Sequence, residues 1–289
     1  MKEQIIVSLT TWSKRIHNIP KVLDTIFAQT VPPDFVVLNL AFDEQIPPVV
    51  VEYIRKHTIV VNRVPDTKVY KKLIPSLIKY PNDCIISIDD DWLYPQDMIS
   101  DFMEVHKSYP NNPISGNREI LFNMQCHCGC ASLMKFAFLG HYIDEINDEI
   151  IEKCPSDDIV YTFFANKAGF PYMRTHGLYF TNMLSYNDCN SYSNTVVFSN
   201  SNGIKETYKY LVEKYGVIES PTSLYFNDKN VFKIVNDIYQ KEKVLESQNS
   251  KKQGRNEIYN TKSFKIGNAL LKPLSILKKK LIPHFKLNL

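Results

Sequence analysis

Glycine is scarce in this sequence, with nine glycines in 289 residues. The charged fraction is a moderate 22%, and together the two values argue against a fibrous or linker-rich chain. The hydrophobic fraction of 44% and the aromatic fraction of 12% are high enough to build a buried core. The length fits one large α/β domain or two small ones.

Long apolar runs are missing as well. No run approaches the length of about 18 apolar residues that a membrane-spanning helix needs, so we expect no such helix. The first apolar stretch, residues 5–9, is too short for the core of a secretory signal and continues into polar Thr10 and Thr11. We therefore expect a cytoplasmic protein with reduced cysteines. The six cysteines are Cys84, Cys126, Cys128, Cys130, Cys154 and Cys189.

Three of these cysteines lie in the segment 126–130, which reads Cys-His-Cys-Gly-Cys and suggests zinc. Structural zinc sites usually take their four ligands from two separated close pairs. Cys154 and Cys189 are single, so the sequence holds no second close pair and argues against zinc at this segment.

Acidic residues are absent after Glu257, whereas seven lysines follow it. Residues 1–257 carry 27 basic and 31 acidic side chains, a net charge of −4. The mildly acidic body argues against nucleic acid as a partner. In residues 262–286 leucines and isoleucines recur at helical intervals between the lysines, so we expect residues 262–289 to form a basic amphipathic tail on an anionic membrane surface. The alternative is a helix that packs on the body.

The first hundred residues alternate between strand-like and helix-like segments. Such alternation predicts βαβ units, hence an α/β fold with a mostly parallel sheet flanked by helices. Ligands of such sheets bind beyond the carboxyl ends of the strands. We expect strands at 5–9, 35–40, 58–62 and 83–88, and helices at 20–29, 48–56, 71–79 and 96–107, with Pro75 as an early break in the third helix.

Beyond residue 110 the pattern is less regular. The expected strands are 119–124, 131–133 and 172–174, the expected helices are 144–152, 157–168, 205–215 and 229–243, and 186–203 is expected to be a loop. We divide the chain into a domain at 1–244, a polar linker at 245–261 and the tail at 262–289. The domain has a donor half of about 1–110 and an acceptor half of about 111–244.

The segment 84–95, CIISIDDDWLYP, ends a buried strand with three consecutive aspartates, Asp89, Asp90 and Asp91. Adjacent carboxylates repel one another unless a cation screens them. Mg²⁺ or Mn²⁺ suits such a site, because these ions bind one or two carboxylates together with phosphate oxygens of a substrate. In an extended segment Asp89 and Asp91 would point the same way. The alternative is an acidic turn that caps the helix after it.

Three segments resemble a known family. They are 6–16 (IVSLTTWSKRI), 70–75 (YKKLIP) with the strand and aspartates that follow, and 155–160 (PSDDIV). Across about residues 4–180 the chain resembles nucleotide-sugar transferases of the GT-A fold, close to glycosyltransferase family 2 of bacterial polysaccharide synthesis. This resemblance implies a metal-dependent glycosyltransferase that uses a nucleotide-diphosphate sugar, in particular a UDP-sugar. The implied acceptor is a glycan or a lipid-linked glycan, at the inner face of the membrane.

The resemblance also implies roles for individual residues. Thr10 and Trp12 would lie near the base of the nucleotide, and Asp43 would be an acid that contacts this base. Asp89 would contact the ribose, with Asp90 beside it in the donor site, and Asp91 would bind the metal. His176 follows a predicted strand and is a candidate to complete the metal shell.

Two pairs of side chains have further candidate roles. Lys71 or Lys72 could bind a diphosphate as a point charge, or could simply begin a solvated helix. Asp157 and Asp158 match the acidic pair that supplies the general base in inverting members of the family. They also begin an apolar helical run, where a carboxylate is a favourable cap. We expect Asp158 to be the base and consider Asp157 next.

Two other functions are compatible with parts of this pattern. A nucleotidyltransferase on a related sheet generally has a glycine-rich loop after the first strand, but residues 10–17 (TTWSKRIH) contain no glycine. A non-catalytic module would bind lipid or nucleic acid through the tail. Removal of residues 258–289 would abolish all ligand binding by such a module, whereas an enzyme would still bind its donor.

Overall fold

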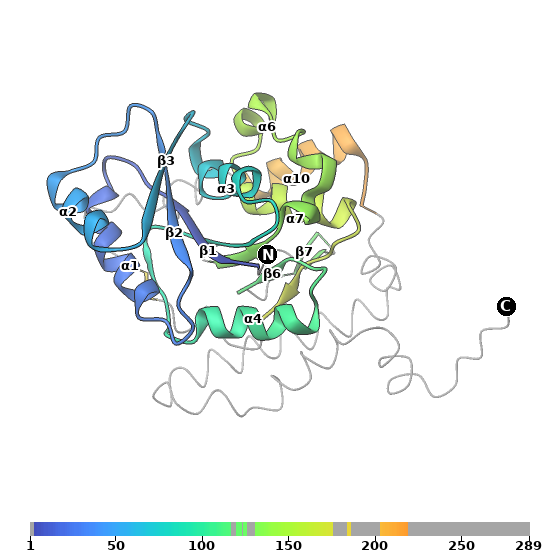
Figure 1. Cartoon of the computed structure of the whole chain (residues 1–289). Helices are drawn as coiled ribbons and strands as arrows, with labels where there is room; N and C mark the ends of the chain where they lie inside the picture. The colour runs from blue at the N-terminus through green and yellow to red at the C-terminus, as the bar shows by residue number, and fades with distance from the viewer. Residues whose placement is uncertain are drawn as a thin grey trace, which may run out of the picture. The chain divides into compact units, whose positions relative to one another are not determined.

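A seven-stranded sheet forms the centre of the computed structural model, in the order β10-β6-β9-β4-β1-β2-β3 (Figure 1). The structure describes residues 3–116, 120–122, 124–125, 131–175, 184–185 and 203–218, which all fall in one unit, Met1–Ser223. The strands of the sheet are β1 (Ile5–Thr10), β2 (Phe35–Ala41), β3 (Ile59–Val64), β4 (Cys84–Ile88), β6 (Ile114–Ser115), β9 (Ala131–Met134) and β10 (Met173–Arg174).

Strands β3, β2, β1 and β4 run parallel, so their carboxyl ends share one edge of the sheet. Strand β9 is antiparallel to both β4 and β6, and β10 is parallel to β6. Two short antiparallel pairs stand apart from this sheet. They are β5 (Trp92–Leu93) with β11 (Leu184–Ser185) and β7 (Ile120–Leu121) with β8 (Met124–Gln125).

Helices cover both faces of the sheet and create two apolar cores. One core contains the inward faces of α1 (Ile19–Phe27), α2 (Pro48–Lys56) and α4 (Met98–Ser108). The other contains residues of η2 (Lys68–Lys72), α3 (Ile74–Lys79), α5 (Phe136–Leu139), η3 (Gly140–Ile143), α6 (Asp148–Lys153), α7 (Asp157–Lys167) and α10 (Gly203–Tyr215). Successive strand residues alternate between the cores, as a period of two requires. In β1, Val7 packs in the first core and Ile6 in the second.

The first hundred residues agree closely with expectation, and all four predicted strands are confirmed. The third helix is the exception. It divides into η2, which ends at Lys72, and α3, which begins at Ile74 with Pro75 in its first turn. The expected early break is therefore present at Leu73, and Pro75 lies in the first turn of α3, which does not use the N–H that proline lacks. A short 3₁₀ helix, η1 (Ile16–Asn18), precedes α1.

In the second half, several predicted bounds were wrong. The strand expected at 119–124 is the hairpin β7–β8, and the helix expected at 144–152 begins only at Asp148. The Asn147 side chain accepts hydrogen bonds from the N–H groups of Glu149 and Ile150, and this cap fixes the start of α6. Residues 186–202, 229–243 and 245–289, which include the expected linker and tail, lie outside the described residues. Within the described ranges, no helix is long and apolar enough to cross a membrane.

Candidate functional site

Five carboxylates and two cations meet at the carboxyl edge of the parallel strands. The turn after β4 supplies three of the acids, and the first residues of α7 supply the other two. One cation follows β1 and the other ends η2. The acids are Asp89, Asp90, Asp91, Asp157 and Asp158, and the cations are Arg15 and Lys72.

Arg15 joins two of the acids. Its Nη2 atom lies 2.7 Å from Asp90 Oδ1, and its Nη1 atom lies 2.8 Å from Asp91 Oδ2. Thr11 Oγ1 donates a 2.6 Å hydrogen bond to the other oxygen of Asp90. Asp90 is fully enclosed, and its burial raises its pKa while Arg15 and Thr11 act in the opposite direction. Asp90 is thus an internal anchor for the turn, and Asp91 lies nearer the surface.

Lys72 joins the other three acids. Its Nζ atom lies 3.0 Å from Asp89 Oδ1. It also lies 3.0 Å from Asp157 Oδ2 and 3.5 Å from Asp158 Oδ1. Burial of Lys72 opposes its charge, but the three carboxylates hold its pKa well above the usual value. Lys72 therefore stays protonated and connects the acidic turn after β4 with the start of α7.

The site carries more negative than positive charge. Five ionised carboxylates against two cations would leave a net charge of −3. Burial and then Asp89 raise the pKa of Asp91 to about 7. Burial raises the pKa of Asp157 to about 7 as well, against the effect of Lys72. Both raised pKa values mean that the site disfavours further negative charge. An added cation would therefore favour the ionised carboxylates.

A buried network of polar side chains, here called the polar seam, holds the main chain of Lys72. Its members are Ser8, Asn39, Asn62 and Ser76. Ser8 Oγ donates a 2.6 Å hydrogen bond to the main-chain carbonyl of Lys72 and lies 2.7 Å from Ser76 Oγ. Asn39 Nδ2 donates to both hydroxyls at 3.0 Å. Asn62 Nδ2 extends the seam with a 2.8 Å hydrogen bond to Asn39 Oδ1. These contacts fix the end of η2 on the sheet.

Tyr94 holds the acidic turn itself. The N–H of Asp89 donates a 2.8 Å hydrogen bond to Tyr94 Oη, and this hydroxyl donates in turn to the Asp89 carbonyl at 3.0 Å. We considered an extended acidic segment, but residues 90–91 form a turn. The carboxylates of Asp89 and Asp91 consequently pair with different cations.

The other predicted residues lie around this centre. Thr10 Oγ1 donates to the carbonyl of Asn39 at 2.8 Å. The Trp12 side chain is 37% exposed, with Lys14 Nζ 5.1 Å from its ring centre. Asp43 is exposed just after β2.

Lys71 differs from its neighbour in the chain, because its ammonium pairs with Asp66. The structure thus brings Lys72 into the acidic centre and directs Lys71 elsewhere. His176 lies outside the described residues.

The acids fit a hard divalent cation. Among the described residues, no three ligand atoms at this edge lie within 4.8 Å of one another. Mg²⁺ and Mn²⁺ need only one or two protein carboxylates, because water and phosphate oxygens complete their coordination shells. Asp91 and Asp89 would hold the ion, because their side chains are 14% and 23% exposed, whereas that of Asp90 is 2% exposed.

Sequence reasoning missed Arg15 and Thr11. Both belong to the segment 6–16, which we singled out for other residues. A usable signal was present, because β1 and β4 are parallel neighbours and the segments after them, with Arg15 and the aspartates, therefore share one edge of the sheet. The pairing of β1 with β4 has to be known before this signal can be used.

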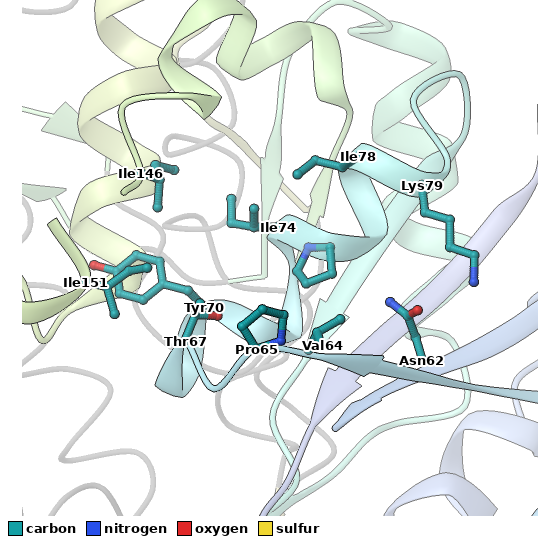
Figure 2. A pocket seen from close by; sticks show the side chains of 11 residues that line it. Asn62, Val64, Pro65, Thr67, Tyr70, Ile74, Ile78, Lys79, Ile146 and Ile151 are labelled. Carbon is teal, nitrogen blue, oxygen red and sulfur yellow. The ribbon is translucent and has the colours of Figure 1, made fainter. Parts of the chain in front are cut away.

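An apolar cavity of about 350 Å³ lies beside α3, outside the acidic centre (Figure 2). Its walls come from the end of β3, from η2 and α3, and from residues 146–151. Tyr70 lines the cavity, while its hydroxyl donates to the carbonyl of Cys154 at 2.6 Å. None of the five carboxylates lines this cavity, so it is separate from the candidate site.

The sequence matches no family model and no curated protein. A solved structure does match. It is the mannosyltransferase PcManGT from Pyrobaculum calidifontis in complex with GDP-Man and Mn²⁺, at 12% identity and a TM-score of 0.56. The match covers 76% of this chain and 66% of the mannosyltransferase. The chain has a GT-A fold.

The GT-A fold confirms the predicted mostly parallel sheet with flanking helices. Two other solved structures are more distant. S. aureus TarS with UDP-GlcNAc has 14% identity and a TM-score of 0.44, over 60% of this chain and 56% of TarS. A 4-diphosphocytidyl-2C-methyl-D-erythritol synthase has 10% identity and a TM-score of 0.43, over 68% of this chain and 97% of the synthase. Neither likeness is close enough to support an argument about this chain.

Proposed function

We propose that this chain is a metal-dependent glycosyltransferase. It would move a sugar from a nucleotide-diphosphate sugar, in particular a UDP-sugar, to a hydroxyl of a glycan or lipid-linked glycan. The observation that carries the proposal is the surplus of carboxylates at the carboxyl edge of a GT-A sheet. The mannosyltransferase of the same fold binds GDP-Man and Mn²⁺, which supports a nucleotide sugar and a divalent ion here.

In this proposal Asp91, with Asp89, holds Mn²⁺ or Mg²⁺. The bound ion would supply positive charge to neutralise the diphosphate that leaves with the nucleotide. Asp89 would also accept a hydrogen bond from the ribose. Arg15 and Asp90 keep the turn in place, since Arg15 pairs with Asp90 and Asp91 at 2.7 and 2.8 Å. His176 is proposed as a further metal ligand.

The nucleotide would lie along the ends of β1 and β2. The Trp12 ring is partly exposed, so it can offer an aromatic surface to a base. The residues proposed to line this part of the donor site are Thr10, Trp12, Asp43 and Asp89. Lys71 and Lys72 would lie beside it, paired with Asp66 and with the acids, and Asp90 would support the turn from inside.

Asp158 is proposed as the general base. It would take the proton from the acceptor hydroxyl while the oxygen bonds to the anomeric carbon and the diphosphate leaves. Its side chain is 17% exposed, and Lys72 Nζ is 3.5 Å away. The Asp157 side chain is 8% exposed and lies closer to Lys72, which leaves it less access to an acceptor. Asp157 is the second choice for this role.

The test is calorimetric titration of the full chain with UDP, GDP and CDP, with and without Mn²⁺. We expect one nucleotide to bind in a Mn²⁺-dependent manner, with binding weakened at least tenfold in Asp91→Asn. The matched control is Asp97→Asn, an exposed aspartate at the start of α4 that should bind like the parent. Folded protein that binds no nucleotide would sink the proposal. Release of diphosphate from CTP or UTP would instead identify a nucleotidyltransferase.

A further inference from the structure

A second cluster of metal-ligating side chains lies at the opposite edge of the sheet. Glu3 precedes β1, Cys84 is the first residue of β4, and His106 lies in α4. Strand β4 runs for five residues from Cys84 before the acidic turn begins. At about 3.3 Å per residue, this strand separates the two clusters by roughly 16 Å. The cluster is therefore independent of the proposed donor site.

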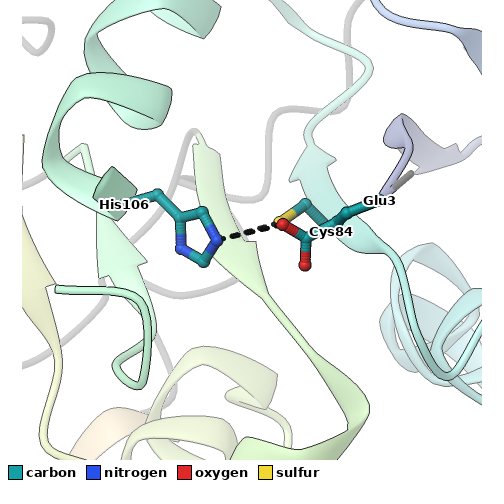
Figure 3. Close-up of side chains that lie close together, drawn as sticks. All are labelled: Glu3, Cys84 and His106. Carbon is teal, nitrogen blue, oxygen red and sulfur yellow. Dashed lines mark hydrogen bonds and ion pairs between the residues drawn. The ribbon is translucent and has the colours of Figure 1, made fainter. Parts of the chain in front are cut away.

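The three side chains converge on a single point (Figure 3). Cys84 Sγ lies 3.5 Å from His106 Nε2, and this nitrogen lies 3.3 Å from Glu3 Oε2. All three ligand atoms lie within 4.8 Å of one another, and no other group of three among the described residues does so.

These separations are those of ligands around tetrahedral zinc. With Zn–S about 2.3 Å and Zn–N or Zn–O about 2.0 Å, tetrahedral angles place sulfur and nitrogen about 3.5 Å apart and nitrogen and oxygen about 3.3 Å apart. Both values match the observed distances. An S, N, O ligand set selects Zn²⁺ over Mg²⁺, because thiolate and imidazole are softer ligands than carboxylate and water.

Burial and charge are also suitable. Cys84 is fully buried and the His106 side chain is 8% exposed, while that of Glu3 is 33% exposed and leaves a route from solvent. Lys135 pairs with Glu3 Oε1, so that Oε2 faces His106. A thiolate and a carboxylate carry two negative charges against the two of the ion, and Lys135 adds one positive charge beside Glu3.

We propose that Glu3, Cys84 and His106 bind Zn²⁺, with water as the fourth ligand on the side of Glu3. On binding, the Cys84 thiol releases its proton to solvent, and a zinc–sulfur bond forms without any change of oxidation state. The ion ties the segment before β1 to β4 and α4.

The competing explanation is a trio held by hydrogen bonds alone, and Co²⁺ distinguishes the two. A thiolate bound to Co²⁺ gives a charge-transfer band in the near ultraviolet, and tetrahedral Co²⁺ gives strong visible bands. The carboxylates at the other edge can produce no thiolate band. We expect the metal-free full chain to develop both signals on addition of one equivalent of Co²⁺, and Zn²⁺ to displace the Co²⁺.

Variants assign the site. We expect Cys84→Ser to lose the thiolate band and His106→Gln to bind Zn²⁺ at least about 100-fold more weakly in competition with a chelating dye. Glu3→Gln should weaken Zn²⁺ binding less than His106→Gln does. Because Glu3 is partly exposed, this variant still tests the site if Cys84→Ser does not fold. Cys154→Ser is the matched control, because Cys154 is also a buried free thiol.

A triple variant, Cys126→Ser with Cys128→Ser and Cys130→Ser, tests the other cysteine-rich segment and should keep the band. The proposal is overturned if the parent protein gives no thiolate band. It is equally overturned if the triple variant loses the band, or if the Glu3 and His106 variants bind Zn²⁺ as tightly as the parent.

Discussion

Arg15 neutralises the most deeply buried acid of the site. Asp90 is 2% exposed and receives one hydrogen bond from Thr11 and an ion pair from Arg15. Removal of the guanidinium would leave a carboxylate in the interior without its countercharge. Buried ion pairs that lose one partner typically cost about 3–5 kcal/mol.

We therefore predict that Arg15→Ala lowers the free energy of unfolding by about 3–5 kcal/mol, measured by urea denaturation at pH 7. The control is Arg55→Ala, whose partner Glu52 is exposed and whose loss should cost less than about 1 kcal/mol. Arg15→Met combined with Asp90→Asn should recover part of the loss, since the Asp90 charge is removed together with its partner. Equal effects of Arg15→Ala and Arg55→Ala would contradict this account.

Asp91 makes stability depend on pH. Its pKa is about 7 in the folded protein against an ordinary value of 3.8, because of burial and Asp89. The folded state thus binds this proton more tightly than the unfolded state does. The resulting stabilisation is complete below about pH 4 and is lost as the pH rises through 7.

For the metal-free protein, we predict that the free energy of unfolding falls between pH 4 and pH 7. In Asp91→Asn the fall should be smaller, and Asp157, with its pKa also near 7, accounts for a remaining part. Urea titrations in the presence of a chelator measure both curves, with Asp144→Asn, the change of an exposed aspartate, as the control. Superimposable curves for Asp91→Asn and the parent would refute the assignment.

At the scale of elements, the position of η2 on the sheet determines where Lys72 points. Ser8 in β1 donates to the Lys72 carbonyl, and this hydrogen bond lies in the buried polar seam. Loss of a buried hydrogen bond typically costs about 1–3 kcal/mol when its partner is left unpaired. Here the loss would also release the end of η2.

We predict that Ser8→Ala lowers the free energy of unfolding by about 1–3 kcal/mol and weakens nucleotide binding in the calorimetric assay. Ser87→Ala is the matched control, since Ser87 is equally buried and lies 3.0 Å from Ser132 Oγ on the same sheet. It should lose similar stability and bind nucleotide normally. Unchanged binding in Ser8→Ala would show that the seam does not position Lys72.

The larger elements could be predicted from the sequence because each carries its own signal. Strand β2 is an almost uninterrupted apolar run, and α1 combines an early proline with apolar residues at helical spacing. Strands β5 and β6 have two residues each, too few for any periodicity. Their existence depends on neighbours far away in the chain, which a local pattern does not contain.

The site was predictable only in part for a similar reason. The three consecutive aspartates after β4 can be recognised in the sequence, because they directly follow an apolar strand. The pairing of Lys72 with acids on two distant segments depends on the packing of η2 and α7 against the sheet. Lys71 and Lys72 therefore looked equivalent in the sequence, although their partners differ.

At the scale of the whole molecule, the basic tail and the acidic body should act separately. From the sequence we expect the tail to bind anionic lipid, and in our proposal the donor binds at the carboxyl edge of the sheet. We predict that removal of residues 258–289 leaves nucleotide affinity within about twofold and reduces sedimentation with anionic lipid vesicles at least tenfold. Added salt should weaken the vesicle binding of the parent. A truncated protein that binds no nucleotide, although folded, would favour the non-catalytic module.

The polar seam also has a consequence for how the strands find one another. Strand β2 reads Phe-Val-Val-Leu-Asn-Leu-Ala, so its apolar residues alone would tolerate a two-residue shift against β1. A two-residue shift that moved Asn39 past Thr10 would carry its amide away from Ser8, and a one-residue shift would turn the amide into the opposite, apolar core. Both misalignments bury an unpaired amide. The alignment of β2 on β1 and the position of Lys72 therefore depend on the same buried contacts.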